Sequence, residues 1–114
     1  MRTSITAATI ALALVLPAAA QDVTSRADAL ALIDGGTFIE RSNSLGRDIR
    51  STFKRGRWTQ TELNGKQLGR SSYFINRKGQ FCRRGQGCQT VRAEGRDFRL
   101  VGSRGAGKKF RRAD

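Results

Sequence analysis

A glycine-rich segment late in the chain has the spacing of a phosphate-binding loop. Gly102-Ser103-Arg104-Gly105-Ala106-Gly107-Lys108-Lys109 matches the pattern G-x4-G-K. Such a loop needs Ser or Thr after that Lys to hold magnesium, and a helix whose N-terminus faces the phosphates. Here Lys109 takes the place of the hydroxyl residue, and five residues follow it. The segment therefore predicts a flexible glycine-rich turn and no nucleotide cofactor.

The residue types that most often perform catalysis are scarce. The chain contains no His, and Ser71-Ser72 has no evident base to activate its hydroxyls. An acid–base pair would have to come from four carboxylates: Asp48, Glu62, Glu94 and Asp97. These carboxylates are more simply ion-pair partners of the surrounding Arg residues. We therefore expect no catalytic residue, and a small hydrolase is the least favoured alternative.

Cys82 and Cys88 are the only cysteines. Their C-x5-C spacing, in a chain without His, does not fit a metal site or a redox C-x-x-C pair. In an oxidising compartment the two would form a disulfide, which stabilises so short a loop by about 2 kcal/mol. We expect a structural disulfide and no bound metal.

The positive charge is concentrated after residue 40. Residues 41–114 carry twenty Lys and Arg against five Asp and Glu, whereas residues 21–40 have a net charge of −3. Arg, the commoner of the two, makes bidentate contacts with phosphate and carboxylate groups. The candidate anion-binding residues, of which the first five are expected to meet near the disulfide, are Arg83, Arg84, Arg92, Arg96, Arg99, Lys108, Lys109, Arg111 and Arg112. A solvated cationic surface that needs no ligand is the alternative.

The last basic residues allow two interpretations. Lys108-Lys109-Phe110-Arg111-Arg112 is either a polybasic tail that adheres to anionic lipid at about 1 kcal/mol per basic residue, or an edge strand with a solvated basic rim.

Aromatic residues are interleaved with Arg along the chain, a pattern typical of single-stranded nucleic-acid binding. The residues concerned are Trp58, Tyr73, Phe74 and Phe81, with Arg55, Arg57, Arg70 and Arg83. Strand alternation instead buries most of these aromatics, because the chain has few other large residues for a core. We therefore do not expect nucleic acid as the ligand.

The first twenty residues have the form of a signal peptide. Arg2 precedes an apolar stretch from Ile5 to Leu16, and Ala18-Ala19-Ala20 offers a cleavage site after Ala20. The stretch is too short for a membrane span, which needs roughly 18 or more apolar residues. We expect a periplasmic or secreted protein without a transmembrane segment after cleavage. Residues 21–114 then form one small domain, with 102–114 a Gly-rich turn and a basic C-terminal segment.

The elements that position these groups are mostly short strands. Ser25 and Asp28 resemble a capping box, and Gly35-Gly36 ends the helix that we expect over 26–34. After it, alternation of period two involves Leu45, Ile49 and Phe53, and Asn64-Gly65 predicts a hairpin. Further strands are expected at 57–63, 73–75, 80–83, 89–93, 97–101 and 109–112. The fold class is mainly β: a small antiparallel meander, an open barrel or curled sheet, with one short N-terminal helix.

The chain resembles a group of small exported proteobacterial proteins, mostly of unknown function. The resemblance rests on Gly35-Gly36-Thr37, on Gln80–Arg83 with Cys88–Val91, and on Glu94–Leu100. It implies a small antiparallel β domain with a disulfide-linked hairpin and transfers no catalytic residue.

Together these features predict a monomeric, non-enzymatic exported domain that binds an anionic envelope component. Lipid phosphate, lipopolysaccharide and acidic polysaccharide are the ligand classes, because a positive field attracts polyanions. A protein-interaction or inhibitor domain of the periplasm is the alternative.

Overall fold

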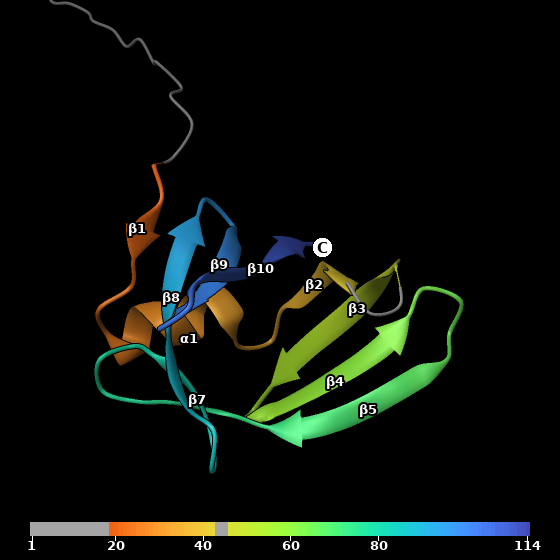
Figure 1. Ribbon diagram of the computed structural model, residues 1–114, viewed down its shortest axis with the longest axis horizontal. Helices are drawn as coiled ribbons and strands as arrows, with labels where there is room; N and C mark the ends of the chain where they lie inside the picture. The colour runs from red at the N-terminus through yellow and green to blue at the C-terminus, as the bar shows by residue number, and fades with distance from the viewer. Residues whose placement is uncertain (1–18, 43–45) are drawn as a thin grey trace, which may run out of the picture.

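The computed structural model describes residues 19–42 and 46–114. Most of the predicted signal peptide, and Leu45 in the predicted alternation, lie outside the described residues. The described part of the chain forms one short helix and ten strands, which pair into one antiparallel sheet (Figure 1). The predicted fold class is therefore confirmed.

The elements follow one another with short connections. Their bounds are β1 Gln21–Asp22, α1 Arg26–Ile33, β2 Thr37–Ser42, β3 Arg47–Lys54, β4 Arg57–Glu62, β5 Gln67–Ser72, β6 Phe74–Ile75, β7 Phe81–Arg83, β8 Gly87–Glu94, β9 Asp97–Gly102 and β10 Gly105–Arg112.

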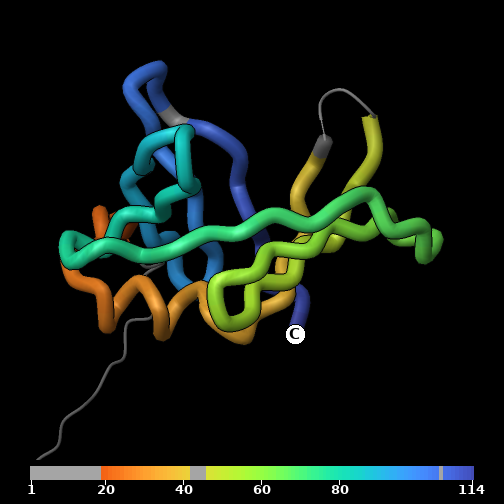
Figure 2. Tube along the Cα trace, turned by 90° about the horizontal axis from the view of Figure 1, so that it is seen from below, coloured from red at the N-terminus to blue at the C-terminus, as the bar shows by residue number. Residues whose placement is uncertain are grey.

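The sheet curls until its two ends meet. Its strand order is β5-β4-β3-β2-β10-β9-β8-β7-β6, with β1 paired to β8. The end strands β5 and β6 are separated in the chain by Tyr73 alone. The Tyr73 amide donates a hydrogen bond to the Gly56 carbonyl, with 2.8 Å between N and O. The result is a nearly closed barrel, with β3–β5 on one side and β7–β10 on the other (Figures 1 and 2).

The helix begins where the sequence predicts. Ser25 Oγ accepts a hydrogen bond from the Asp28 amide at 3.2 Å, which satisfies a donor of the first turn. The helix ends at Ile33, one residue earlier than predicted, and Asp34 is its C-cap.

α1 covers one end of the barrel. Ala29 and Ile33 are buried in the core. At the end of β10, Arg112 Nη1 donates to the Leu32 carbonyl at 3.2 Å, so the helix is bound to the strand that lies between β2 and β9.

The core is built mainly from aromatic side chains on the inner face of the sheet. Trp58, Tyr73 and Phe81 are buried, as strand alternation predicts, whereas Phe74 is 52% exposed. The other buried aromatics are Phe38, Phe53, Phe98 and Phe110. Aromatic burial on this scale stabilises a chain with few aliphatic core residues.

Three strands, β1, β2 and β5, were not predicted from the sequence, and β1 has only two residues, too few to show a pattern. β2 has Glu40 at an inward position where the period-two pattern calls for an apolar residue, and that side chain is fully buried. β5 has Gly69 and Ser71 at its inward positions, opposite Gln60 and Trp58. Neither β2 nor β5 therefore shows the alternation of apolar and polar residues that identifies a half-buried strand.

The C-terminal basic segment is neither a flexible turn nor an edge strand. The turn after β9 involves Ser103 and Arg104, and β10 already begins at Gly105. A Cβ added at Gly107 would lie 2.6 Å from the Leu100 carbonyl oxygen, so glycine permits close backbone packing there. β10 pairs with both β2 and β9, and Phe110 is 1% exposed. The predicted glycine-rich turn is therefore shorter than expected, and the edge-strand interpretation is wrong because β10 is an interior strand. Adhesion of this segment to anionic lipid stays a prediction.

The predicted disulfide is present. Cys82 and Cys88 lie directly opposite each other on β7 and β8 and are bonded. The bond links the two strands of this hairpin covalently.

Candidate functional site

Most of the predicted anion-binding residues already have acidic partners. Six of the nine form ion pairs, with nitrogen–oxygen distances between 2.7 and 3.9 Å. The pairs are Arg92 with Asp22, Arg99 with Glu94, Lys108 with Glu40, Lys109 with Glu94, Arg111 with Asp48, and Arg112 with Asp114.

The structure brings together only part of the group expected near the disulfide. Arg92 and Arg99 are register partners on the outer face of β8 and β9. Glu94 lies between Arg99 and Lys109, and the hydrogen bond from Lys109 is the main reason that its pKa is lowered. The cations of this face are therefore interleaved with carboxylates, which weakens the field that they present to an anion.

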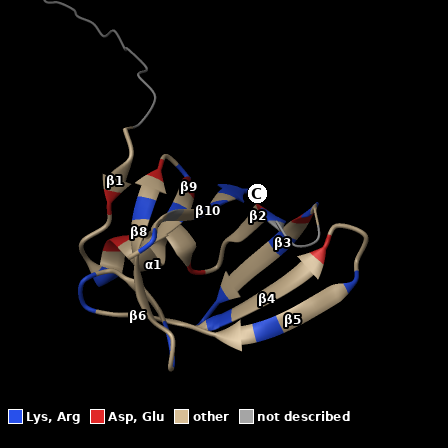
Figure 3. Ribbon diagram, in the orientation of Figure 1, with Lys and Arg blue, Asp and Glu red and all other residues tan. Residues whose placement is uncertain are grey.

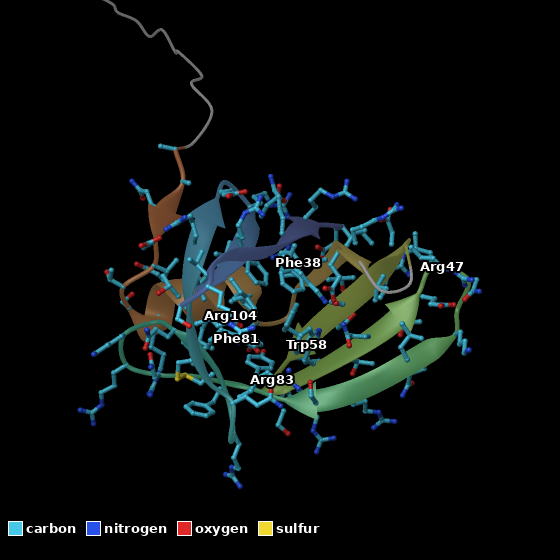
Figure 4. All side chains as sticks on the ribbon, viewed as in Figure 1. Phe38, Arg47, Trp58, Phe81, Arg83 and Arg104 are labelled. Carbon is cyan, nitrogen blue, oxygen red and sulfur yellow. A yellow bond between two sulfur atoms is a disulfide. The ribbon has the colours of Figure 1, made fainter. Side chains whose placement is uncertain are left out.

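Arg83 lies on the other face of the sheet. Its guanidinium carbon lies 5.3 Å from the centre of the Trp58 ring, inside the barrel, and Figure 4 shows both residues beside Phe81. This distance is that of a cation–π contact. Arg84 is exposed in the β7–β8 turn, and the Arg96 side chain donates to the Asp114 carbonyl. Arg83, Arg84 and Arg96 thus do not join Arg92 and Arg99 in one patch.

A buried carboxylate occupies the inner face of β2. Glu40 Oε1 accepts hydrogen bonds from Ser51 Oγ at 2.7 Å and from Gln60 Nε2 at 2.8 Å. Lys108 Nζ lies 3.3 Å from Oε2, close enough for an ion pair but without the geometry of a hydrogen bond. These contacts compensate a charge that is expensive to bury alone.

A different set of cations lacks acidic partners. Phe53 on β3 and Trp58 on β4 point inward, so the residues at the alternate positions of these two strands face outward. We call the resulting group the basic face: Arg50, Lys54, Arg55, Arg57 and Arg70. All five are exposed, and none forms an ion pair with any carboxylate in the described part of the chain. Figure 3 shows the Lys and Arg segments on β3, β4 and β5.

The register concentrates charge on this face. Lys54 lies directly opposite Arg57, and Arg70 lies opposite Thr59 on the next strand. Like charges directly opposite each other destabilise a sheet unless a counter-charge lies nearby. The carboxylate on the outer side of β3, Asp48, lies at the opposite end of the strand from Lys54, and it pairs there with Arg41 and Arg111.

The basic face is hollowed at the β3–β4 hairpin. Thr52, Lys54, Arg55, Arg57 and Thr59 line an open hollow of about 530 Å³, which we call the hairpin hollow. Three cations and two hydroxyl groups at one concave place can bind an anion through charge and through hydrogen bonds.

Apolar side chains flank the basic face along β5 and β6. Leu68 is 37% and Phe74 is 52% exposed. Phe74 lies between the buried residues Tyr73 and Ile75, and Leu68 shares the exposed alternate positions of β5 with Arg70, so these apolar groups are on the outer side with Arg70. Large apolar groups beside cations are typical of surfaces that enter a membrane interface.

The sequence contained a partial signal for this site. Arg55, Arg57 and Arg70 stand among aromatic residues that the fold buries, so their own side chains must face outward. Asn64-Gly65 predicted a hairpin, but the bounds of its second strand and the register with β4 were not predicted, and without them Arg70 could not be placed beside Thr59.

Residues 19–42 and 46–114 lack two kinds of feature. No group of three Cys, Asp or Glu side chains there could hold a metal ion. Within the same residues, no helix has the length and the apolar character required to cross a membrane.

Comparison of the chain with protein-family models, with curated proteins and with solved structures found no match.

Proposed function

We propose that this chain is an exported, non-enzymatic domain that binds membrane surfaces containing anionic lipid through the basic face. The observation that carries the proposal is the distribution of ion pairs. Cations on β8–β10 are matched with carboxylates, whereas Arg50, Lys54, Arg55, Arg57 and Arg70 are not. An uncompensated group of cations attracts anionic lipid at about 1 kcal/mol per basic residue near the surface.

The apolar flank favours lipid over a soluble polyanion. An acidic polysaccharide would contact the Arg, Lys and Thr side chains of this face but would leave the apolar groups of Leu68 and Phe74 exposed to water. A lipid surface uses both features, since the cations meet the phosphates and the apolar groups enter the boundary with the acyl chains. The exposure of Phe74, in a domain that buries its other aromatic residues, supports this choice.

Export is part of the same proposal. The apolar stretch before Ala20 predicts it, and the bonded pair Cys82–Cys88 is of the kind that persists in oxidising compartments. The lipid surface would then be one that faces the periplasm or the exterior.

Neutralising two cations of the basic face tests the proposal. Arg57→Gln with Arg70→Gln should weaken binding to phosphatidylglycerol vesicles by about 30-fold, because two phosphate contacts of about 1 kcal/mol each are lost. Arg92→Gln with Arg99→Gln removes the same charge from the compensated face and should change binding much less. Co-sedimentation at low and moderate salt measures both, and binding should decline as salt screens the charges.

Two results would refute this assignment. Equal losses from both double variants would mean that net charge alone attracts the protein to the vesicles. Absence of wild-type binding at low salt, together with retention on immobilised heparin, would replace lipid by a soluble polyanion.

A further inference from the structure

The turn of the β3–β4 hairpin contains an unfavourable residue. Arg55 and Gly56 have φ angles of +52° and +79°, the left-handed conformation of a two-residue type I′ turn. Asn-Gly is the preferred pair for such a turn, because Asn and Gly tolerate positive φ. Arg55 is the only residue other than glycine with positive φ in the described part of the chain.

The surrounding structure holds the turn in place. Asp34 Oδ1 accepts a hydrogen bond from the Arg55 amide at 2.9 Å and another from the Tyr73 hydroxyl at 2.8 Å. Burial, and then the hydrogen bond to Asp34, raise the pKa of Tyr73, so this hydroxyl remains a donor. These contacts fix the backbone of the turn and leave the Arg55 guanidinium exposed.

An Arg in a strained position suggests a role for its side chain. Backbone strain of this kind persists where the neighbouring structure imposes it, and it concentrates at functional sites. Arg55 lines the hairpin hollow with Lys54 and Arg57, and Thr52 and Thr59 supply hydroxyl groups. An unfavourable backbone, a hollow and three uncompensated cations thus occur together.

We propose that the hairpin hollow binds a phosphomonoester group. This inference rests on the proposed function and specifies the lipid headgroup that the basic face prefers. A phosphomonoester carries about −1.5 to −2 charges at neutral pH and three strong acceptor oxygens. A phosphodiester headgroup carries one charge and has fewer free oxygens. Three cations, two of them Arg with paired N–H donors, therefore distinguish the monoester from the diester.

The first arm of the test compares lipids. Vesicles of phosphatidic acid and of phosphatidylglycerol, matched in surface potential, should differ about tenfold in affinity for the wild-type protein, the effect of one strong charge-assisted contact. Arg55→Asn should abolish this preference and weaken binding to phosphatidylglycerol by only about fivefold, the contribution of one basic residue. The same variant should raise Tm by about 4 °C, because Asn suits the turn and relieves the strain. Arg77→Asn, in the exposed turn after β6, is the matched control and should alter neither quantity.

The second arm separates a lipid headgroup from a free phosphate. Glycerol 3-phosphate should shift the NMR amide signals of residues 54–57, and the corresponding phosphodiester should not. Equal wild-type affinity for both vesicle types, without shifts by glycerol 3-phosphate, would overturn the phosphomonoester site and leave the lipid surface proposal standing. Shifts by glycerol 3-phosphate without vesicle binding would support the hollow and refute the lipid surface.

Discussion

Replacing Phe53 with alanine is expected to lower the free energy of unfolding by about 4 kcal/mol. The Phe53 ring is fully buried and lies at the centre of the aromatic core, on the inner face of β3. Its centroid lies between 5.5 and 5.9 Å from the rings of Phe38, Trp58, Tyr73, Phe81, Phe98 and Phe110. These rings come from strands on both sides of the barrel, so they cannot collapse together into the cavity that alanine would leave.

Denaturant unfolding followed by Trp58 fluorescence measures this effect. Phe74→Ala is the matched control, because its ring is half exposed and its removal should change the free energy of unfolding by less than about 0.5 kcal/mol. A loss below about 1 kcal/mol for Phe53→Ala would show that the aromatic core does not hold the two sides of the barrel together.

The second large effect is expected at the buried carboxylate. Lys108→Met should lower the free energy of unfolding by about 2 kcal/mol, because it leaves Glu40 without a counter-charge. The loss is smaller than for a fully buried ion pair, since the Lys108 side chain is 47% exposed. Glu40 itself is fully buried, and the bonds from Ser51 and Gln60 reach only one of its oxygens.

A second substitution identifies the cause. Adding Glu40→Gln to Lys108→Met removes the unpaired charge while the oxygen that Ser51 and Gln60 reach is kept, so most of the lost stability should return. If the double variant is as unstable as Lys108→Met alone, the loss comes from packing of the Lys108 stem and not from the buried charge.

The features that the sequence predicts well are local. Ser25 and Asp28 form a helix cap from neighbouring residues, and Asn64-Gly65 connects β4 and β5 as a hairpin. The disulfide also follows from a short segment, because Cys82 and Cys88 are close in the chain. In each case the determining contacts lie within a few residues, so pattern and turn chemistry suffice.

Long-range pairing accounts for what the sequence could not predict. Arg92 and Asp22 are separated by 70 residues and form an ion pair because β1 lies against β8. Which Arg residues are compensated therefore depends on the register of the sheet. The composition predicted a basic surface, but the binding residues predicted from the sequence were mainly C-terminal cations, and most of these form ion pairs in the fold. Glu40 was missed for a related reason, since its partners Ser51, Gln60 and Lys108 lie on three other strands, β3, β4 and β10.

Paramagnetic relaxation from spin-labelled lipid headgroups is the most direct test of the membrane face. In anionic bicelles, the NMR amide signals of residues 50–59 and 68–74 should broaden most, because the basic face and its apolar flank contact the surface. Signals of residues 92–99 should be affected least, since they lie on the compensated face of β8 and β9. Broadening centred on residues 92–99, or spread evenly over the domain, would contradict the assignment of the basic face as the membrane-binding surface.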